Sequence, residues 1–223
     1  MEPISTAVRV PIGAQSLDGD LTVPPGARGI VVFAHGSGSS RHSPRNQFVA
    51  RTFERAGFGT LLIDLLTRQE ESVDIRTAEY RFDIPLLARR LESIVEWLRR
   101  QPSTSSLAIG LFGASTGGGA ALIAAAAKAD DIAAVVSRGG RPDLAGAALP
   151  RVTAPTRLIV GGLDTEVIQL NQQAMRKMRG AVDMQIVPGA SHLFEEPGAL
   201  ETVATLATDW FLRHFGRTVT AER

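Results

Sequence analysis

The chain has 223 residues, 44% of them hydrophobic and 21% charged, which fits a single domain over residues 1–223 better than two. Its 24 basic and 23 acidic residues leave a net charge of +1, so we expect no surface for nucleic acid or for an anionic membrane. The absence of cysteine excludes disulfides and thiol catalysis.

Two segments could be mistaken for targeting signals. Residues 1–14 contain an acidic residue and two prolines but no continuous apolar core, so we expect no secretory signal and a cytoplasmic protein. The apolar stretch 107–127 is interrupted by glycines and a serine, and it fits a strand, a turn and a helix better than a membrane span. We expect a small-molecule substrate as the partner, and a monomer or homodimer.

Short apolar runs predict strands, and apolar residues at 3.6-residue spacing predict helices. In chain order we expect strands over 7–12, 17–23 and 29–34, a helix over 46–56, a strand over 60–64, and a helix over 84–98 capped by Asp83. A strand over 107–112, a helix over 118–128, strands over 133–137, 157–160 and 184–187, and a helix over 199–215 follow. This alternation predicts an α/β protein with a mostly parallel sheet of about seven to eight strands and helices on both faces.

The residues Gly113, Ala114, Ser115, Thr116 and Gly117 stand between a predicted strand and a predicted helix. A serine at such a sharp turn is held in strained geometry with its Oγ exposed, and glycines two positions away on either side avoid a collision. A chain with 22 glycines can contain this pattern by chance, so the strand-to-helix context carries the interpretation. We predict that Ser115 is a nucleophile.

A second glycine pattern, His35, Gly36, Ser37 and Gly38, follows the strand predicted over 29–34. In acyl transfer, negative charge develops on a carbonyl oxygen, and two backbone amides stabilise it. One comes from the residue after the nucleophile and one from a loop such as this. We therefore predict an oxyanion hole made by the amides of Ser37 and Thr116, with an ordinary glycine turn as the alternative.

A serine nucleophile needs a base and an acid, which follow it in the order acid, then histidine. His192 comes directly after the strand 184–187, whereas His214 falls inside the last predicted helix, so His192 is the predicted base. Asp164 follows the strand 157–160 and is the predicted acid. The alternatives for the acid are Asp143, Glu166 and Asp183.

Two further histidines precede the nucleophile. His35 belongs to the glycine loop, and we expect it to form local hydrogen bonds. His42 lies in the polar loop that follows and is a candidate for substrate contact, although most such residues are only solvated. The chain shows no ligand cluster for a metal, and the triad needs no cofactor, so we expect neither.

These motifs together resemble a small α/β-hydrolase of the dienelactone hydrolase-like group, over nearly the whole chain. The resemblance implies an α/β-hydrolase fold, and the segment between Ser137 and Pro155 is too short for a separate cap domain. Dienelactone hydrolases proper carry a cysteine nucleophile, whereas this chain has Ser115, which is similar to the carboxylesterases that share the fold. The implied activity is hydrolysis of small or short-acyl carboxylic esters, or lactones, through an acyl-enzyme intermediate.

The substrate pocket should be open and shallow, with walls from residues 39–45, 65–78, 138–149 and 193–196. Arg138 and Arg141 follow a predicted strand, and a planar guanidinium suits a substrate carboxylate. A structural or solvated role is the commoner one for such arginines, and the same caution applies to Arg41, Arg45 and Arg68. An acyltransferase or thioesterase with the same triad, and a non-catalytic binder with the same fold, are the alternative functions.

Overall fold

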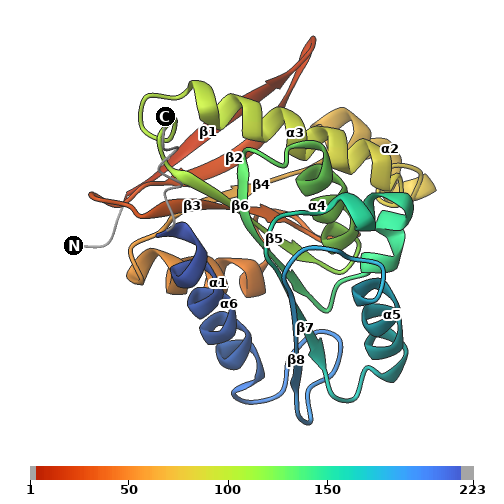
Figure 1. The fold of residues 1–223 in the computed structure, drawn as a ribbon. Helices are drawn as coiled ribbons and strands as arrows, with labels where there is room; N and C mark the ends of the chain where they lie inside the picture. The colour runs from red at the N-terminus through yellow and green to blue at the C-terminus, as the bar shows by residue number, and fades with distance from the viewer. Residues whose placement is uncertain (1–3, 217–223) are drawn as a thin grey trace.

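The computed structural model describes residues 4–216, and these form one eight-stranded sheet (Figure 1). Its strands are β1 (Ser5–Ile12), β2 (Gln15–Thr22), β3 (Gly29–Ala34), β4 (Gly59–Ile63), β5 (Ala108–Ala114), β6 (Ile132–Arg138), β7 (Thr156–Gly161) and β8 (Val182–Val187). They lie in the order β1-β2-β4-β3-β5-β6-β7-β8. Only the pairings of β2 are antiparallel, so the strands from β4 to β8 run parallel and their carboxyl ends share one edge.

Helices cover both faces of the sheet (Figure 1). They are α1 (Pro44–Arg55), α2 (Arg68–Thr77), α3 (Ile84–Arg100), α4 (Thr116–Ala127), the 3-10 helix η1 (Pro142–Arg151), α5 (Thr165–Met175) and α6 (Ala199–Phe215). Helices α1 and α6 pack together on one face, and α3, α4 and α5 lie on the other. None of the helices within residues 4–216 is long and apolar enough to cross a membrane.

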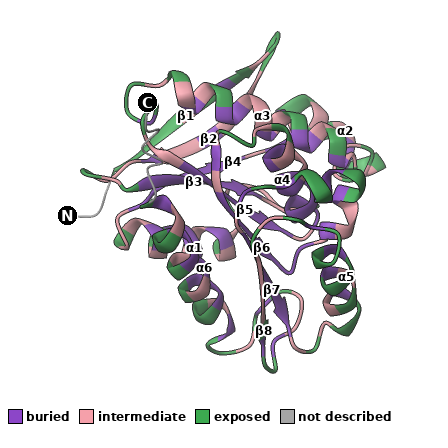
Figure 2. Cartoon of the chain, in the orientation of Figure 1, coloured by how far each residue is buried: buried purple, intermediate pink, exposed green. Residues whose placement is uncertain are grey.

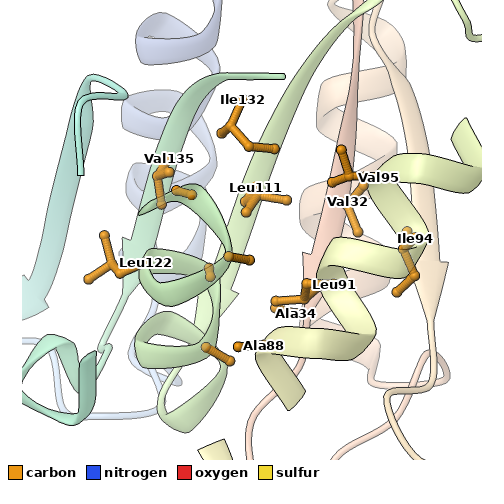
Figure 3. Packing of buried hydrophobic residues seen from close by; sticks show 14 of the residues in the cluster. Val32, Ala34, Ala88, Leu91, Ile94, Val95, Leu111, Leu122, Ile132 and Val135 are labelled. Carbon is orange, nitrogen blue, oxygen red and sulfur yellow. The ribbon is translucent and has the colours of Figure 1, made fainter. Parts of the chain in front are cut away.

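Two apolar cores hold these layers to the sheet, and the buried strands run between them (Figure 2). In the first, Leu91 and Val95 of α3 and Leu122 of α4 pack on Val32 and Leu111 of the central strands (Figure 3). The second core is rich in phenylalanine and lies under α1 and α6. Closely packed cores tolerate little displacement of their side chains. The two cores therefore hold the carboxyl ends of the strands in fixed positions relative to one another.

The fold class and every element predicted from the sequence are confirmed, with ends that differ by two residues or fewer. Three helices were not predicted: α2, η1 and α5. Helix α2 has a single buried residue, Asp74, so it lacks the apolar spacing on which the other predictions rest. The 3-10 helix η1 fills the connection between β6 and β7 and packs against α4, where a cap domain would otherwise begin.

Candidate active site

The elbow predicted around Ser115 lies at the junction of β5 and α4. Ser115 has φ 50° and ψ −123°, a backbone conformation that residues other than glycine rarely adopt. Such a backbone costs on the order of 1–3 kcal/mol and persists only where its surroundings fix it. Ser115 is the N-cap residue of α4, yet its side chain makes no capping hydrogen bond. The hydroxyl is therefore not used to cap the helix.

The strained turn is fixed by its neighbours on both sides. The Ser115 amide donates a hydrogen bond to the Arg138 carbonyl at 3.3 Å, and the Arg141 amide donates to the Ser115 carbonyl at 3.0 Å. On the other side, a Cβ atom at Gly117 would lie 2.1 Å from the carbonyl oxygen of Ala34. Only glycine permits this approach, so the elbow is locked between the ends of β6 and β3.

The predicted oxyanion loop lies directly against this elbow. A Cβ atom at Gly36 would be 3.1 Å from the Cβ atom of Ser115. The Ser37 amide donates a hydrogen bond to Thr116 Oγ1 at 3.0 Å. Thr116 is the first residue of α4, where free amides favour negative charge. The structure thus places Ser37 and Thr116 side by side, next to the serine.

His192 and Asp164 lie on adjacent loops that follow β8 and β7. His192 Nδ1 and Asp164 Oδ2 are 2.6 Å apart, and the Leu163 amide ties the two loops together by donating to the Ala190 carbonyl at 2.9 Å. Because Nδ1 faces the carboxylate, Nε2 is the nitrogen left to accept a proton. The ring lies against the loop that follows β6, since a Cβ atom at Gly139 would be 3.6 Å from His192 Cε1, and the carbonyl of the preceding residue, Arg138, accepts from the Ser115 amide.

The three other acidic candidates are held elsewhere. Asp143 and Asp183 form ion pairs with Arg141 and Arg157, at 2.7 and 2.6 Å, and Glu166 lies in the first turn of α5. Among the ion pairs of the described residues, the one that includes His192 is made by Asp164.

His35 forms the local hydrogen bonds expected of it. Its Nε2 accepts from the Leu65 amide at 3.0 Å, so Nδ1 carries the proton and donates to the Gly36 carbonyl at 3.0 Å. Burial lowers the pKa of His35 below its ordinary 6.5, and the bond to Gly36 opposes that shift without cancelling it. The neutral imidazole therefore joins the oxyanion loop to the end of β4.

The two arginines predicted to bind substrate differ sharply. Arg141 is neutralised by both carboxylate oxygens of Asp143, at 2.8 and 2.7 Å. Arg138 is 8% exposed, its Nε has no hydrogen-bond partner, and no ion pair of the described residues includes it. Burial, together with the neighbouring charge of Arg45, lowers the pKa of Arg138 to about 10. Its guanidinium carbon lies 5.9 Å from the centre of the Phe194 ring.

The arginines singled out with caution are paired. Arg41 pairs with Asp64 and Asp20, Arg45 with Glu195, and Arg68 with Asp18. These ion pairs account for the positions of the three arginines. Among the predicted substrate-binding residues, Arg138 alone carries a buried charge that no carboxylate neutralises within the described residues.

A cavity of about 710 Å³ opens beside the oxyanion loop, within the size range of ligand sites. Gly36 and Ser37 form part of its wall, whereas Ser115 and His192 lie outside the lining. The predicted walls 39–45 and 65–78 both contribute, and His42 is exposed on the first of them. The predicted walls 138–149 and 193–196 do not contribute, so the cavity is one-sided rather than an open bowl around the serine.

The cavity wall also contains an ion pair that sequence reasoning missed. The buried Asp74 accepts hydrogen bonds from the amides of Tyr80 and Arg81 and from Arg81 Nε, at 2.7 to 2.9 Å. Burial alone would raise the pKa of Asp74, but these bonds outweigh it and hold the pKa below its ordinary value. Because α2 was not predicted, no sequence signal placed either side chain at the site. Within residues 4–216, no three potential metal ligands gather in one place.

The strand order, the strained serine and the histidine with its aspartate define an α/β-hydrolase. The model of the dienelactone hydrolase family matches residues 17–215, and the chain belongs to this family. The crystal structure of a dienelactone hydrolase from Anabaena variabilis is 56% identical, covers 96% of this chain and 99% of its own, and superposes with a TM-score of 0.95. The predicted resemblance is therefore confirmed.

Two other relatives differ in what they show. A dienelactone hydrolase-like promiscuous phosphotriesterase from metagenomic libraries is 20% identical, covers 97% of this chain and all of its own, and has a TM-score of 0.79, which shows the fold alone. A Mycobacterium tuberculosis protein provisionally named a phosphoribosyl transferase is 58% identical over 207 residues. That match covers 93% of this chain but 46% of the relative, so the chain spans about half the length of the curated relatives it matches.

Proposed function

We propose that this hydrolase cleaves small carboxylic esters, or lactones, through an acyl-enzyme formed on Ser115. The observation that supports this best is the 2.6 Å contact between His192 Nδ1 and Asp164, at the same edge of the sheet as a serine whose backbone is strained and whose hydroxyl does not cap its helix. Together they supply a nucleophile, a base and an orienting carboxylate.

In the proposed reaction, Ser115 Oγ attacks the ester carbonyl while its proton moves to Nε2 of His192. The carbonyl electron pair moves onto oxygen, and the amides of Ser37 and Thr116 stabilise the resulting oxyanion. Asp164 stabilises the imidazolium, which then gives its proton to the leaving alcohol as the carbon–oxygen bond breaks. Water, activated by the same histidine, releases the acid and restores the serine.

We propose that the preferred ester carries a negative charge that reaches Arg138. A buried guanidinium without a counter-ion destabilises the folded protein, so a charge of this kind is expected where a ligand supplies the missing anion. Arg138 ends the strand next to the elbow. Arg45, whose positive charge helps to lower the pKa of Arg138, lines the cavity. His42 at the cavity rim would contact the distal part of the same substrate. Arg141 is not part of this proposal, because Asp143 already neutralises it.

The proposed reaction is tested with p-nitrophenyl esters of increasing acyl length. Ser115→Ala and His192→Ala should each lower kcat by about five to six orders of magnitude while leaving the unfolding transition in place. Asp143→Asn is the matched control, since that carboxylate lies outside the triad and should leave kcat within threefold. Activity that survives in the serine variant would remove the proposal. Added alcohol that captures the acyl group in preference to water would instead indicate an acyltransferase with the same triad.

The charge preference is tested with two substrates, p-nitrophenyl acetate and the p-nitrophenyl monoester of glutaric acid. Arg138→Met should raise KM for the anionic ester by about 10- to 100-fold, the worth of one charge-assisted hydrogen bond, and leave the acetate within threefold. Arg141→Met is the control and should change neither value. Equal effects of Arg138→Met on both substrates would contradict a role in binding the anion.

A further inference from the structure

The hydroxyl of Thr116 makes an unexpected contact with the predicted oxyanion loop. Thr116 was predicted to contribute only its backbone amide, yet its side-chain Oγ1 accepts the hydrogen bond of the other predicted donor, the Ser37 amide, at 3.0 Å. The residue is 6% exposed, so water does not compete freely for this contact. The oxyanion donor is thus already engaged by a neutral hydroxyl in the free protein.

The Thr116 hydroxyl takes the acceptor position at the Ser37 amide that an oxyanion would need. Oxyanion-hole donors lie about 2.7–3.1 Å from the charged oxygen, and Thr116 Oγ1 lies 3.0 Å from the Ser37 nitrogen. The same hydroxyl belongs to the residue whose own amide is the second donor. Gly36 holds the same loop against Ser115, since a Cβ atom there would be 3.1 Å from Ser115 Cβ.

We propose that the Thr116 hydroxyl is a catalytic third donor of the oxyanion hole, an inference that rests on the ester hydrolysis proposed above. In the free enzyme it accepts from the Ser37 amide and so holds the oxyanion loop close to the start of α4. When the tetrahedral intermediate forms, the amide turns to the oxyanion, because a charged acceptor binds it more strongly than a neutral one. The hydroxyl is then released from its role as acceptor and donates its own proton, in a hydrogen bond, to the same oxyanion.

This step transfers no proton from Thr116. The bond from Ser115 Oγ to the carbonyl carbon forms, the carbonyl electron pair moves to oxygen, and the serine proton goes to His192. The hydroxyl proton stays on Thr116 Oγ1 throughout. A side-chain rotation about one bond is enough to change the hydroxyl from acceptor to donor. The effect should therefore appear in the transition state and not in the binding of the ground-state ester.

The experiment compares Thr116→Val, which keeps the shape and loses the hydroxyl, with Thr116→Ser, which keeps the hydroxyl. With p-nitrophenyl acetate, the valine variant should lose about 100-fold in kcat with KM within threefold, and the serine variant should stay within about fivefold of the parent. A short alkyl trifluoromethyl ketone, which forms an oxyanion on the serine, should bind the valine variant weaker by the same factor as the loss in kcat/KM. A threonine that contributes only to folding would not produce that match.

Several outcomes would overturn the inference. A valine variant with kcat within threefold of the parent, or faster, would mean that the hydroxyl is a bystander or a competitor of the oxyanion. Equal losses in the valine and serine variants would mean that packing decides. If the valine variant does not fold, Thr116→Ala gives the same comparison without added bulk. Failure of the proposed function is recognised separately, since Ser115→Ala would then retain the esterase activity of the parent.

Discussion

Replacing Gly117 by alanine tests how the elbow and the oxyanion loop are held together. The added methyl group would lie 2.1 Å from the carbonyl oxygen of Ala34 and 2.6 Å from that of His35. Both atoms are backbone at the end of β3, so no side chain can rotate away. Ordinary contact begins at 3.4 Å, which means that the first gap has to open by at least 1.3 Å.

This displacement sets the expected magnitude. The oxyanion loop continues directly from these carbonyls to Ser37, so its amide must move by a similar amount away from the serine. A misplacement of about 1 Å costs roughly 100-fold in rate, and complete loss of one oxyanion donor costs about 10²–10³-fold. We therefore expect Gly117→Ala to lower kcat by at least about 100-fold and to destabilise the fold by about 1–3 kcal/mol through overpacking.

The assay is kcat for p-nitrophenyl acetate, measured beside urea unfolding to show that the variant is folded. Gly216→Ala is the matched control, because a Cβ atom there meets nothing within 4 Å and its φ is negative. Gly36→Ala provides an intermediate case, since its Cβ would lie 3.1 Å from Ser115 Cβ and needs only a small shift. The rate loss should follow the overlap in these three variants. A folded Gly117→Ala enzyme with kcat within threefold of the parent would refute the reasoning.

Three further predictions follow from the site. Asp164→Asn should lower kcat by about 10⁴-fold, because the amide favours the wrong tautomer of His192, whereas Asp143→Asn should not; a loss below tenfold in the first variant would contradict the assignment. His35 has a lowered folded pKa, so its contribution to stability is complete above pH 6.5 and is lost as the pH falls below 6.5, by at most about 1.4 kcal/mol per pH unit. Urea unfolding at pH 7.5 and 5.5 should show this loss in the parent and not in His35→Gln. An equal change in unfolding free energy between the two pH values in both proteins would contradict the prediction. Arg138→Met should unfold at the same or a higher temperature, since a pKa lowered to about 10 corresponds to about 3 kcal/mol against the buried charge; a lower melting temperature would show that the guanidinium has a partner.

The candidate site residues could be chosen from the sequence because each follows a predicted strand: Ser115 and Asp164 follow the buried strands β5 and β7, and His192 follows the edge strand β8. The parallel strands end at one edge, so Ser115, Asp164 and His192 converge there although they are far apart in the chain. The elbow glycines carry their own signal, since the turn needs glycine for steric reasons. These features depend on local pattern and on topology, which a sequence expresses directly.

The remaining parts of the site depend on contacts between side chains, which leave little trace in a sequence. Arg138 and Arg141 are equivalent in pattern, yet one is buried without a counter-ion and the other is held by Asp143. The polar helix α2, which brings Asp74 into the cavity wall, has no apolar periodicity to reveal it. The bond between the Ser37 amide and Thr116 Oγ1 joins residues 79 positions apart and is visible only in the structure.

The central claim, that Ser115 is activated by His192 to form a covalent intermediate, is tested most directly by a fluorophosphonate reagent followed by peptide mass spectrometry. We expect the reagent to modify Ser115 in the parent enzyme and to react more than 100-fold more slowly with His192→Ala. Modification of a different residue, or an equal rate in the two proteins, would contradict the account.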